Sequence, residues 1–341
     1  MKKYSELQEY LKSNQYTWLV TGAAGFIGSN LVEKLLTLNQ KVIGLDNFDT
    51  GFQYNVDQAL AEAKNGLKWQ GLELIQENFK FIVGDIRKLD DCHSACVGVD
   101  YVLHQAALGS VPRSIGDPIM TNKANIDGFL NMLVAAKDAN CLKKMVYAAS
   151  SSTYGDSKVS PKVEGAEGRP LSPYAVTKLV NELYAEVFSN VYNLHSIGLR
   201  YFNIYGPKQD PNNPYAAVVP LFIAAALKKE RPKIFGDGAT ARDFTYVENA
   251  VQANIKGMLN GRALAQHEVV NIACGKQTSL LQIWEQLRQM ENINLTPVFL
   301  EERAGDIKLS LASIKKAEEL IGYHPEVHFK EGLKYTLEYA K

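Results

Sequence analysis

Tyr174 and Lys178, in the segment SPYAVTK, are spaced for acid-base chemistry. Residues four apart lie on one face of a helix, so the phenol and the ammonium would be neighbours there. An isolated tyrosine titrates near pH ~10, and a fixed positive charge beside it favours the phenolate. Such a pair can take a proton from a hydroxyl group at neutral pH. The same spacing also occurs in ordinary helices, where it serves only surface packing.

The residues around this pair predict the start of a helix. Ser172 is a suitable N-cap and Pro173 a suitable first helical residue. Tyr174 would then lie in the first turn, where the positive end of the helix dipole also favours phenolate. An apolar stripe of the kind that helices bury continues the pattern, formed by Leu179, Leu183 and Val187.

A glycine-rich turn near the N-terminus predicts a phosphate-binding loop. Gly22, Gly25 and Gly28, in TGAAGFIGSN, follow an apolar run and open a helical pattern. Glycines let a phosphate approach the backbone, and the helix N-terminus offers free N–H groups. The alternative interpretation is a tight turn with close helix packing. Asp46 ends the next apolar run, where a carboxylate can bind both hydroxyls of an adenosine ribose and so favours NAD over NADP. Asp46 could instead cap a turn.

The elements that must position these residues alternate regularly along the chain. Short apolar runs indicate buried parallel strands at 18–21, 41–45, 79–83, 101–104, 144–149 and 196–200. Helical periodicity lies between them, at 29–38, 125–139 and 173–189. Residues 52–78 form a longer excursion that contains a helical stretch. The pattern predicts an α/β fold with a Rossmann-type doubly wound parallel sheet.

The rhythm breaks after Asn203, where turn-rich clusters such as GPKQDPNNP appear. We therefore expect residues 1–200 to form a NAD-binding domain, with a return segment near 245–275. Residues 201–341 would form mainly a smaller, mixed substrate domain, interleaved with the first.

Polar residues follow the ends of the later predicted strands. In open α/β sheets ligands bind along the carboxyl edge of the strands, so these side chains should gather at one site. Singly, each could be a cap or a turn residue. They are Asp85 and Ile86, Gln105 to Ala107, Ser150 to Ser152, and Asn203.

Composition narrows the function further. The 341 residues carry 37 Lys plus Arg and 37 Asp plus Glu, so no charge excess indicates a nucleic-acid or anionic-membrane surface. The polar first residues do not resemble a signal peptide. The longest apolar run, 216–227, is too short to span a bilayer and predicts a buried helix. We expect a cytoplasmic protein. Four scattered cysteines and six unclustered histidines predict reduced thiols and no metal site.

Seven motifs together resemble the extended short-chain dehydrogenase/reductase family: the glycine loop, LDNF, GDI, HQAA, SSSTYG, SPYAVTK and RYFN. The resemblance covers nearly the whole chain. Within the family the chain is most similar to NAD-dependent UDP-hexose 4-epimerases, especially bacterial UDP-N-acetylglucosamine 4-epimerases, some associated with O-antigen synthesis. The resemblance implies that Tyr174 acts as the base, that Lys178 holds the nicotinamide ribose and lowers the phenol pKa, and that Ser150 assists, with Ser151 as the alternative.

The resemblance also implies the residues of two binding sites. Those for tightly held NAD, regenerated in each cycle, are Gly22, Gly25, Phe26, Ile27, Gly28, Asp46, Asn47, Asp49, Thr50, Gly51, Asp85, Ile86, Gln105, Ala106, Ala107, Asn125, Tyr174, Lys178 and Tyr201. Those for the UDP-sugar are Gly109, Ser110, Arg113, Ser150, Ser151, Ser152, Asn203, Ala216, Ala217, Val218, Val219, Phe235, Arg242, Arg303, Asp306 and Ser310. Arginine suits phosphate through its fixed fork of donors.

Ser310 and Arg113 bear on the sugar. Some relatives limited to non-acetylated sugars carry a bulky aromatic where this chain has Ser310, so a small residue leaves room for an N-acetyl group. Arg113 could meet a carboxylate if the sugar were a uronic acid. The resemblance therefore implies epimerisation at carbon 4 through a 4-keto intermediate, interconverting UDP-GlcNAc and UDP-GalNAc. The corresponding UDP-uronic acids and UDP-glucuronate decarboxylation are alternatives.

Two other interpretations are weaker. A 4,6-dehydratase needs an acid pair where this chain has Ser151 and Ser152. A non-catalytic NAD-binding protein would not need Ser150, Tyr174 and Lys178 together. The resemblance further implies a homodimer, formed through a four-helix bundle of the helix starting at Asn125 and the helix that carries Tyr174.

Overall fold

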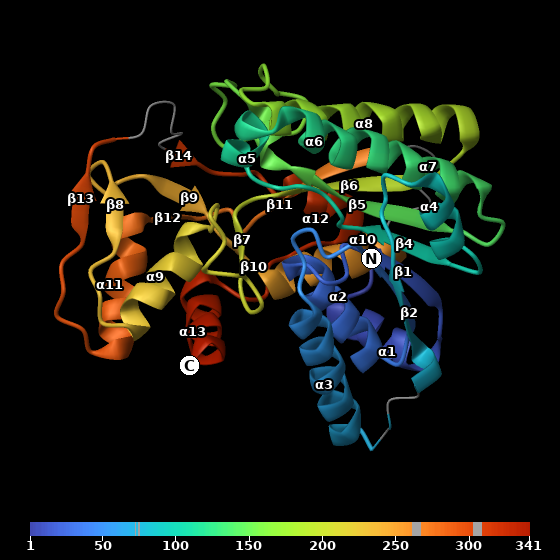
Figure 1. Ribbon diagram of the computed structural model, residues 1–341, viewed down its shortest axis with the longest axis horizontal. Helices are drawn as coiled ribbons and strands as arrows, with labels where there is room; N and C mark the ends of the chain where they lie inside the picture. The colour runs from blue at the N-terminus through green and yellow to red at the C-terminus, as the bar shows by residue number, and fades with distance from the viewer. Residues whose placement is uncertain (72, 74–75, 261–266, 303–308) are drawn as a thin grey trace.

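A seven-stranded parallel sheet forms the centre of the larger lobe in the computed structural model, which describes all residues except 72, 74–75, 261–266 and 303–308 (Figure 1). Its strand order is β11-β6-β5-β4-β1-β2-β3, with every neighbouring pair parallel. The strands are β1 (Thr17–Thr21), β2 (Lys41–Asp46), β3 (Phe79–Val83), β4 (Tyr101–His104), β5 (Lys144–Ser150), β6 (Ser196–Tyr201) and β11 (Glu268–Ile272). The first six confirm the predicted strands, and the predicted Rossmann-type fold is confirmed.

Helices cover both faces of this sheet, as a doubly wound fold requires (Figure 1). On one face lie α4 (Leu89–Ala95), α5 (Val111–Gly116), α6 (Pro118–Asn122), α7 (Gly128–Asp138) and α8 (Pro173–Tyr192). On the other lie α1 (Tyr4–Ser13), α2 (Phe26–Thr37), α3 (Gln53–Trp69), α10 (Val247–Leu259) and α12 (Lys315–Ile321). Each layer encloses its own apolar core, because the central strands are buried on both faces.

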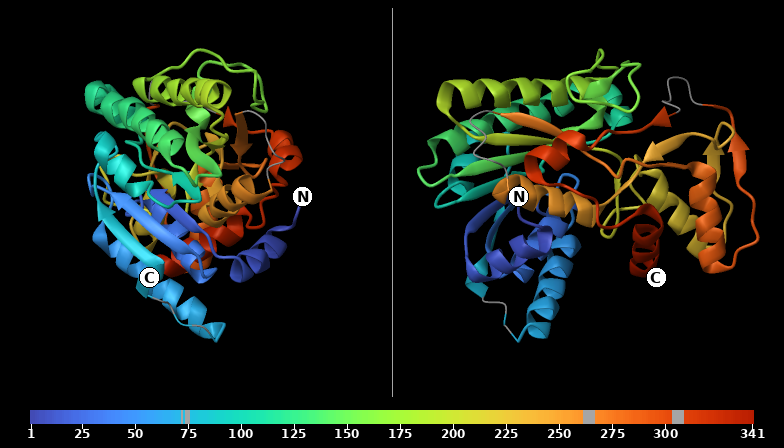
Figure 2. Two further views of the ribbon diagram at one scale, coloured as in Figure 1. Left: turned by 90° about the vertical axis from the view of Figure 1, so that its right-hand side faces the viewer. Right: turned by 180° about the vertical axis from the view of Figure 1, so that it is seen from behind.

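A smaller lobe stands beside the carboxyl ends of the strands (Figures 1 and 2). Its helices α9 (Val218–Leu227), α11 (Leu280–Glu291) and α13 (Phe329–Ala340) pack around a third apolar core. Its short strands are β8 (Lys233–Phe235), β9 (Ala241–Asp243), β12 (Gln277–Ser279), β13 (Val298–Leu300) and β14 (Leu309–Ser310). The two-stranded pair β7 (Ile204–Tyr205) and β10 (Thr245–Tyr246) links the lobes. After β10 the chain returns to the large lobe, where it forms α10 and then β11.

Of the apolar stripe predicted to be buried on α8, Leu179 is partly buried, but the other two residues are exposed. Leu183 and Val187 keep 54% and 51% of their surface accessible. The helix packs on the sheet through a different face, which contains Ala185 and Phe188 together with the polar residues Lys178 and Glu182. The prediction failed for Leu183 and Val187 because the charged residues Lys178 and Glu182 share the inner face with the apolar ones.

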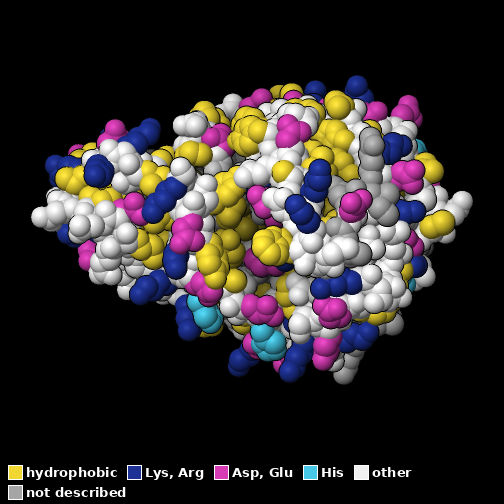
Figure 3. Space-filling model, turned by 90° about the horizontal axis from the view of Figure 1, so that it is seen from below, with side chains coloured by type: hydrophobic (Ala, Val, Ile, Leu, Met, Phe, Trp, Pro, Cys, Tyr) yellow, Lys and Arg dark blue, Asp and Glu magenta, His cyan; other side chains and the backbone are white. Residues whose placement is uncertain are grey.

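The face of the molecule seen from below carries charges of both signs (Figure 3). Positive and negative side chains alternate over the face shown in Figure 3, in keeping with the balanced composition. Within the described chain no helix is both long and apolar enough to cross a membrane.

Candidate active site

Helix α8 positions the predicted base and its neighbouring cation. Ser172 caps it, since its hydroxyl accepts a hydrogen bond from the Ala175 N–H at 3.1 Å, and Pro173 is the first helical residue. Tyr174 therefore lies in the first turn, half-buried, and Lys178 lies buried one turn later. The predicted helix start is confirmed.

Ser150 lies at the carboxyl end of β5 and contacts Tyr174. Its side chain forms a hydrogen bond with the Tyr174 phenol. The Ser152 N–H and hydroxyl also meet the Ser150 hydroxyl, at 3.2 and 2.9 Å, in a 3₁₀ turn formed by Ser151–Tyr154. Of the two serines considered for assisting Tyr174, the geometry thus favours Ser150.

The pKa values of this pair differ from the expectation that Lys178 lowers the phenol pKa. Burial raises the pKa of Tyr174, and the Ser150 hydrogen bond only partly offsets that effect. The Lys178 ammonium lies 6.0 Å from the Tyr174 ring centroid and donates instead to the Ala148 carbonyl at 2.7 Å. Burial lowers the pKa of Lys178 to about 8. The two groups are neighbours, and burial is the largest cause of the pKa shift of each.

The glycine loop has the geometry of a phosphate cradle. Gly22 adopts φ +69°, and a Cβ added to Gly28 would lie only 1.9 Å from the Gly22 carbonyl oxygen. Helix α2 begins immediately afterwards, at Phe26, and no side chain caps it. Its first N–H groups and its dipole are therefore available to an anion.

Asp46 ends β2 beside this loop. Each of its carboxylate oxygens accepts one backbone N–H, from Ala24 at 2.9 Å and from Phe48 at 2.8 Å. Burial raises its pKa, while these hydrogen bonds act in the opposite direction. A carboxylate offers about four lone-pair sites, so Asp46 can cap the turn and still accept ribose hydroxyls. The two interpretations of this residue are compatible.

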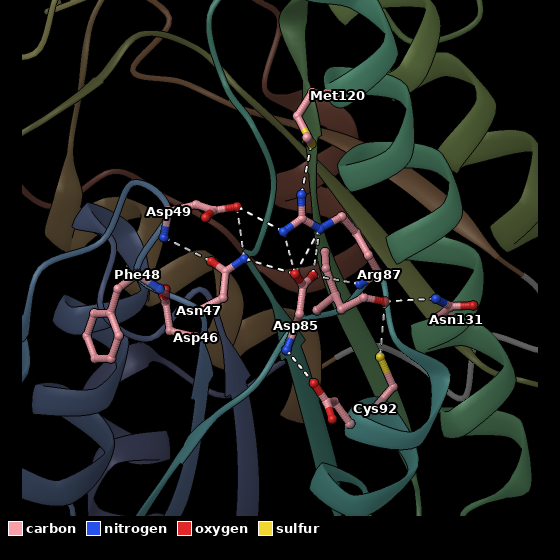
Figure 4. A network of polar contacts seen from close by, with 11 residues as sticks. Asp46, Asn47, Phe48, Asp49, Asp85, Arg87, Cys92, Met120 and Asn131 are labelled. Atoms are coloured by element: carbon pink, nitrogen blue, oxygen red, sulfur yellow. Dashed lines mark hydrogen bonds and ion pairs between the residues drawn. The ribbon is translucent and has the colours of Figure 1, made fainter.

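A polar network joins the ends of β2 and β3 (Figure 4). Arg87 Nε donates to both oxygens of Asp85, at 2.9 and 2.8 Å, and its guanidinium reaches Asp49 at 3.2 Å. Asn47 donates to Asp49 and to Asp85. Burial would raise the pKa of Asp85, but the hydrogen bonds from Arg87 hold it below its usual value. The sequence interpretation missed Arg87, which binds two of the predicted cofactor-binding residues, Asp85 and Asp49.

A cavity of about 440 Å³ brings most predicted site residues together. It extends from the glycine loop to the segment before α9, and so borders both lobes. Predicted residues in its wall are Gly22, Gly25, Phe26, Ile27, Gly28, Asp46, Asn47, Asp49, Thr50, Asp85, Ile86, Gln105, Ala106, Ala107, Gly109, Ser110, Arg113, Ala216 and Ala217. This wall fits NAD, because it combines a helix N-terminus for a diphosphate with a carboxylate for a ribose.

Other predicted residues do not line this cavity. Gly51 packs against Ala24, and Asn125 ties Leu108 to Thr177 on α8. The Tyr201 hydroxyl bridges Gln105 and Asn254, at 3.1 and 2.8 Å. The remaining residues outside its wall are Ser150, Ser151, Ser152, Tyr174, Lys178, Asn203, Val218, Val219, Phe235, Arg242 and Ser310. Arg303 and Asp306 lie outside the described residues.

Strand pairing brings two predicted substrate residues together in the smaller lobe. Ser310 on β14 is the register partner of Arg242 on β9. The buried carboxylate of Asp243 fixes this region, because it accepts the N–H groups of Cys274 at 2.9 Å, Gly275 at 3.0 Å and Ala312 at 3.3 Å. The sequence interpretation missed Asp243, although it follows Arg242 directly.

The segment after β7 adds wall residues that the sequence interpretation treated only as a turn. Lys208, Gln209, Asp210, Asn213 and Tyr215 all line the cavity. The sequence could have indicated these residues as part of the site, because they form a polar cluster just beyond the end of a strand. The Arg113 guanidinium lies 5.2 Å from the Tyr215 ring centroid, which joins the two lobes at the cavity wall. Among the described residues, no His, Cys, Asp and Glu side chains gather in a way that could hold a metal ion.

Comparisons with known proteins agree with this geometry. Residues 18–273 match the model of the NAD dependent epimerase/dehydratase family. A putative UDP-glucose 4-epimerase of Methanocaldococcus jannaschii is 35% identical over 325 residues, covering 95% of this chain and 98% of the relative.

Two solved structures are also similar over nearly the full length of both chains. A UDP-N-acetylglucosamine 4-epimerase from Methanobrevibacter ruminantium, in complex with UDP-N-acetylmuramic acid, has a TM-score of 0.86 at 36% identity and covers 96% of this chain and 98% of its own. A UDP-glucuronic acid 4-epimerase from Bacillus cereus, in complex with UDP-glucuronic acid and NAD, has a TM-score of 0.80 at 31% identity and covers 95% and 98%.

Proposed function

Because the chain belongs to the NAD dependent epimerase/dehydratase family, we propose that it is an NAD-dependent 4-epimerase that interconverts UDP-N-acetylglucosamine and UDP-N-acetylgalactosamine. The coarser activity, UDP-sugar 4-epimerisation with NAD, is supported by relatives and solved structures that span almost the whole chain. The choice of an acetylated sugar is the finer part of the proposal.

The observation that carries the reaction type is the cluster of Ser150, Tyr174 and Lys178 at the carboxyl edge of the sheet. Ser150 contacts the phenol, and Lys178 lies one helical turn from it. A dinucleotide cavity borders the same edge. NAD bound in that cavity would accept hydrogen from carbon 4 of the sugar and return it.

The side chains of this protein would handle the proton and the orientation. Tyr174 takes the proton of the sugar 4-hydroxyl and gives it back after the sugar has turned. Ser150 holds the same oxygen through its hydroxyl. Because burial raises the pKa of Tyr174, the adjacent Lys178 ammonium must stay charged for the phenol to act as a base. Arg242, paired in register with Ser310, would anchor the diphosphate while the sugar turns.

Small residues on the sugar side support an acetylated substrate. Gly109, Ser110 and Ala217 line the cavity, and a Cβ added to Gly109 would meet no atom of the described residues within 4 Å. Ser310, which pairs in register with Arg242 outside the cavity wall, is the small residue that the resemblance associates with acetylated sugars. A pocket with this much space can accommodate the N-acetyl group at carbon 2.

The sugar preference can be tested with a panel of UDP-sugars. Purified protein is incubated without added NAD, and the products are identified by NMR. We expect interconversion of the two acetylated sugars, and we expect Ser310→Tyr to lower their turnover more than that of UDP-glucose. A single methylene group in a pocket changes selectivity by about 10- to 200-fold, so an added phenol ring that meets the sugar should change it by at least the lower figure. Equal losses on both sugar classes would refute the role of Ser310.

A second candidate substrate class is the corresponding UDP-uronic acids. Arg113 lines the cavity, and its guanidinium has no carboxylate partner among the described residues. A carboxylate at carbon 6 could bind there. The same panel tests this alternative, and the UDP-glucuronate arm also detects decarboxylation through release of carbon dioxide.

We further propose that the chain is a homodimer. The exposed face of α8 carries Val176, Leu183, Val187 and Val191, which are 47% to 64% accessible. An apolar row of this length on one helix suits a four-helix bundle formed with α7 and with a second copy. We also propose the division expected from the sequence, with residues 1–200 and the return near 245–275 as the NAD domain and most of 201–341 as the UDP-sugar domain.

A further inference from the structure

A buried ion cluster lies directly behind the Tyr174–Lys178 pair. Arg200, at 4% exposure on β6, donates to both carboxylate oxygens of Glu182 on α8, at 2.9 and 2.7 Å. Its third donor pairs with Glu167, in the loop that precedes α8. Glu182 is itself only 6% exposed. A buried ion pair is costly to desolvate, so stability alone is a weak reason for this arrangement.

Arg200 joins the elements that carry the three predicted catalytic side chains. Its guanidinium lies 4.8 Å from the ring centroid of Tyr154, which ends the 3₁₀ turn that follows Ser150. The Tyr154 hydroxyl donates to Asn271 on β11 at 2.7 Å. Through Glu182 the same guanidinium holds α8. Ser150 and the Tyr174–Lys178 pair are thus tied to one cation.

Lys178 lies among few charged groups. Glu182 is one turn further along α8, and its charge favours the ammonium form of Lys178. From β5 only the Ala148 carbonyl meets the ammonium. From β4 His104 faces it, but burial lowers the pKa of His104 to about 3, so this imidazole is neutral. Tyr174 is the remaining titratable neighbour. Glu182 is therefore the one described anion that offsets the burial of Lys178.

We propose that Glu182 is a positioning residue for the acid-base pair: its buried carboxylate, held in place by the Arg200 fork, keeps Lys178 charged beside Tyr174. Arg200 acts through Glu182 and does not meet the substrate. This inference rests on the proposed function only in assigning Lys178 to the reaction. The charge relation between Glu182 and Lys178 is a property of the protein alone.

The proposal predicts the direction in which Lys178 titrates. In Glu182→Gln the anion is lost while Arg200 stays nearby, so the pKa of Lys178 falls below its value of about 8. Glu182 lies one helical turn from Lys178, and an opposite charge about 4 to 6 Å away shifts a pKa by on the order of one unit. The double variant Glu182→Gln, Arg200→Gln removes both fully buried charges, and of the three ions only the partly exposed Glu167, at 23% side-chain exposure, is left without its partner. It should shift the pKa of Lys178 in the same direction, because the Glu182 charge that raises this pKa is gone, but less, because no unpaired Arg200 cation remains.

Two measurements test this shift in the full-length protein. The first is the pH dependence of kcat, whose high-pH limb should move down by about one pH unit in Glu182→Gln. The second is NMR of protein labelled with carbon-13 lysine, in which Lys178→Arg identifies the Lys178 signal. Glu186→Gln, one turn further along α8 at an exposed position, is the matched control and should leave both titrations unchanged.

The outcomes distinguish a failure of the proposed role of Glu182 from a failure of the proposed function. An unshifted Lys178 titration in Glu182→Gln, equal to that of Glu186→Gln, overturns the proposal. If Glu182→Gln does not fold, the double variant decides, and an unshifted or upward-shifted signal overturns the proposal. A parent protein that turns over no UDP-sugar would refute the proposed function, whereas the NMR titration would still test the role of Glu182.

Discussion

Gly28→Ala should disable cofactor binding through a single added methyl group. A Cβ at this position would lie 1.9 Å from the Gly22 oxygen and 2.6 Å from the Gly22 carbonyl carbon. Ordinary van der Waals contact begins at 3.4 Å, so the two backbones must separate by about 1.5 Å, the difference between 3.4 and 1.9 Å. Both clashing atoms belong to backbone, so no side-chain rotation can relieve the clash.

The loop has little freedom to make that movement. Gly22 already adopts φ +69°, and it lies so close to the residue after β4 that an added Cβ would be 2.8 Å from the Ala106 nitrogen, which leaves little room to retreat in that direction. The start of α2 must move instead, and its N–H groups leave the position that suits a diphosphate. A misplacement of about 1 Å costs on the order of 10²-fold in binding or rate. Overpacking of this kind also costs about 1 to 3 kcal/mol of stability.

Gly109→Ala is the matched control for Gly28→Ala. Gly109 lines the same cavity, but an added Cβ there meets nothing within 4 Å. The assay is the NAD content of the purified variants, followed by titration of NAD into cofactor-depleted protein by calorimetry. We expect at least a 100-fold weaker Kd in Gly28→Ala and less than a threefold change in Gly109→Ala. If Gly28→Ala retains NAD as the parent does, the assignment of the cradle is wrong.

Three further predictions address the chemistry and the assembly. Tyr174→Phe should abolish turnover and retain NAD, and retained turnover would exclude Tyr174 as the base. Because the pKa of Lys178 is about 8 when folded and 10.5 when unperturbed, kcat should fall as pH rises through about 8. A kcat that stays flat from pH 7 to ~9.5 would contradict the role of the ammonium. Lys178 also affects stability: between about pH 8 and 10.5 it binds more protons in the unfolded chain than in the folded one, so it makes the free energy of unfolding rise with pH. Leu183→Glu with Val187→Glu should give a monomer in sedimentation velocity, because both side chains are more than half exposed in the single chain; Glu186→Gln should leave the parent assembly.

Local signals explain why much of the fold could be predicted from sequence. Buried parallel strands read as continuous apolar runs, and a Ser-Pro pair marks a helix start without help from distant residues. The strand ends then predict the site, because parallel strands share one carboxyl edge. Asp46, Asp85 and Gln105 line one cavity for that reason.

Long-range charge pairs explain most of what the sequence did not predict. Arg87 joins Asp85 to Asp49 on another strand end, and Lys208 pairs with Glu33 on α2 although the two residues are far apart in sequence. The hydrophobic periodicity of the sequence does not predict such ion pairs, since each charged residue alone looks like an exposed surface residue. The wrong prediction for the buried face of α8 has the same cause. Glu182 and Lys178 occupy the inner face, whereas Leu183 and Val187 face outward.

The spacing along α8 explains how one carboxylate can support the lysine without disabling the base. Each residue advances a helix by about 1.5 Å, so Glu182 lies roughly 6 Å along the axis from Lys178 and roughly 12 Å from Tyr174. Its charge therefore acts more strongly on the ammonium than on the phenol. A carboxylate closer to Tyr174 along the helix would directly oppose formation of the phenolate. Placed one turn beyond the lysine and held by Arg200, Glu182 keeps a buried cation charged while leaving the phenol to the influence of Lys178 and Ser150.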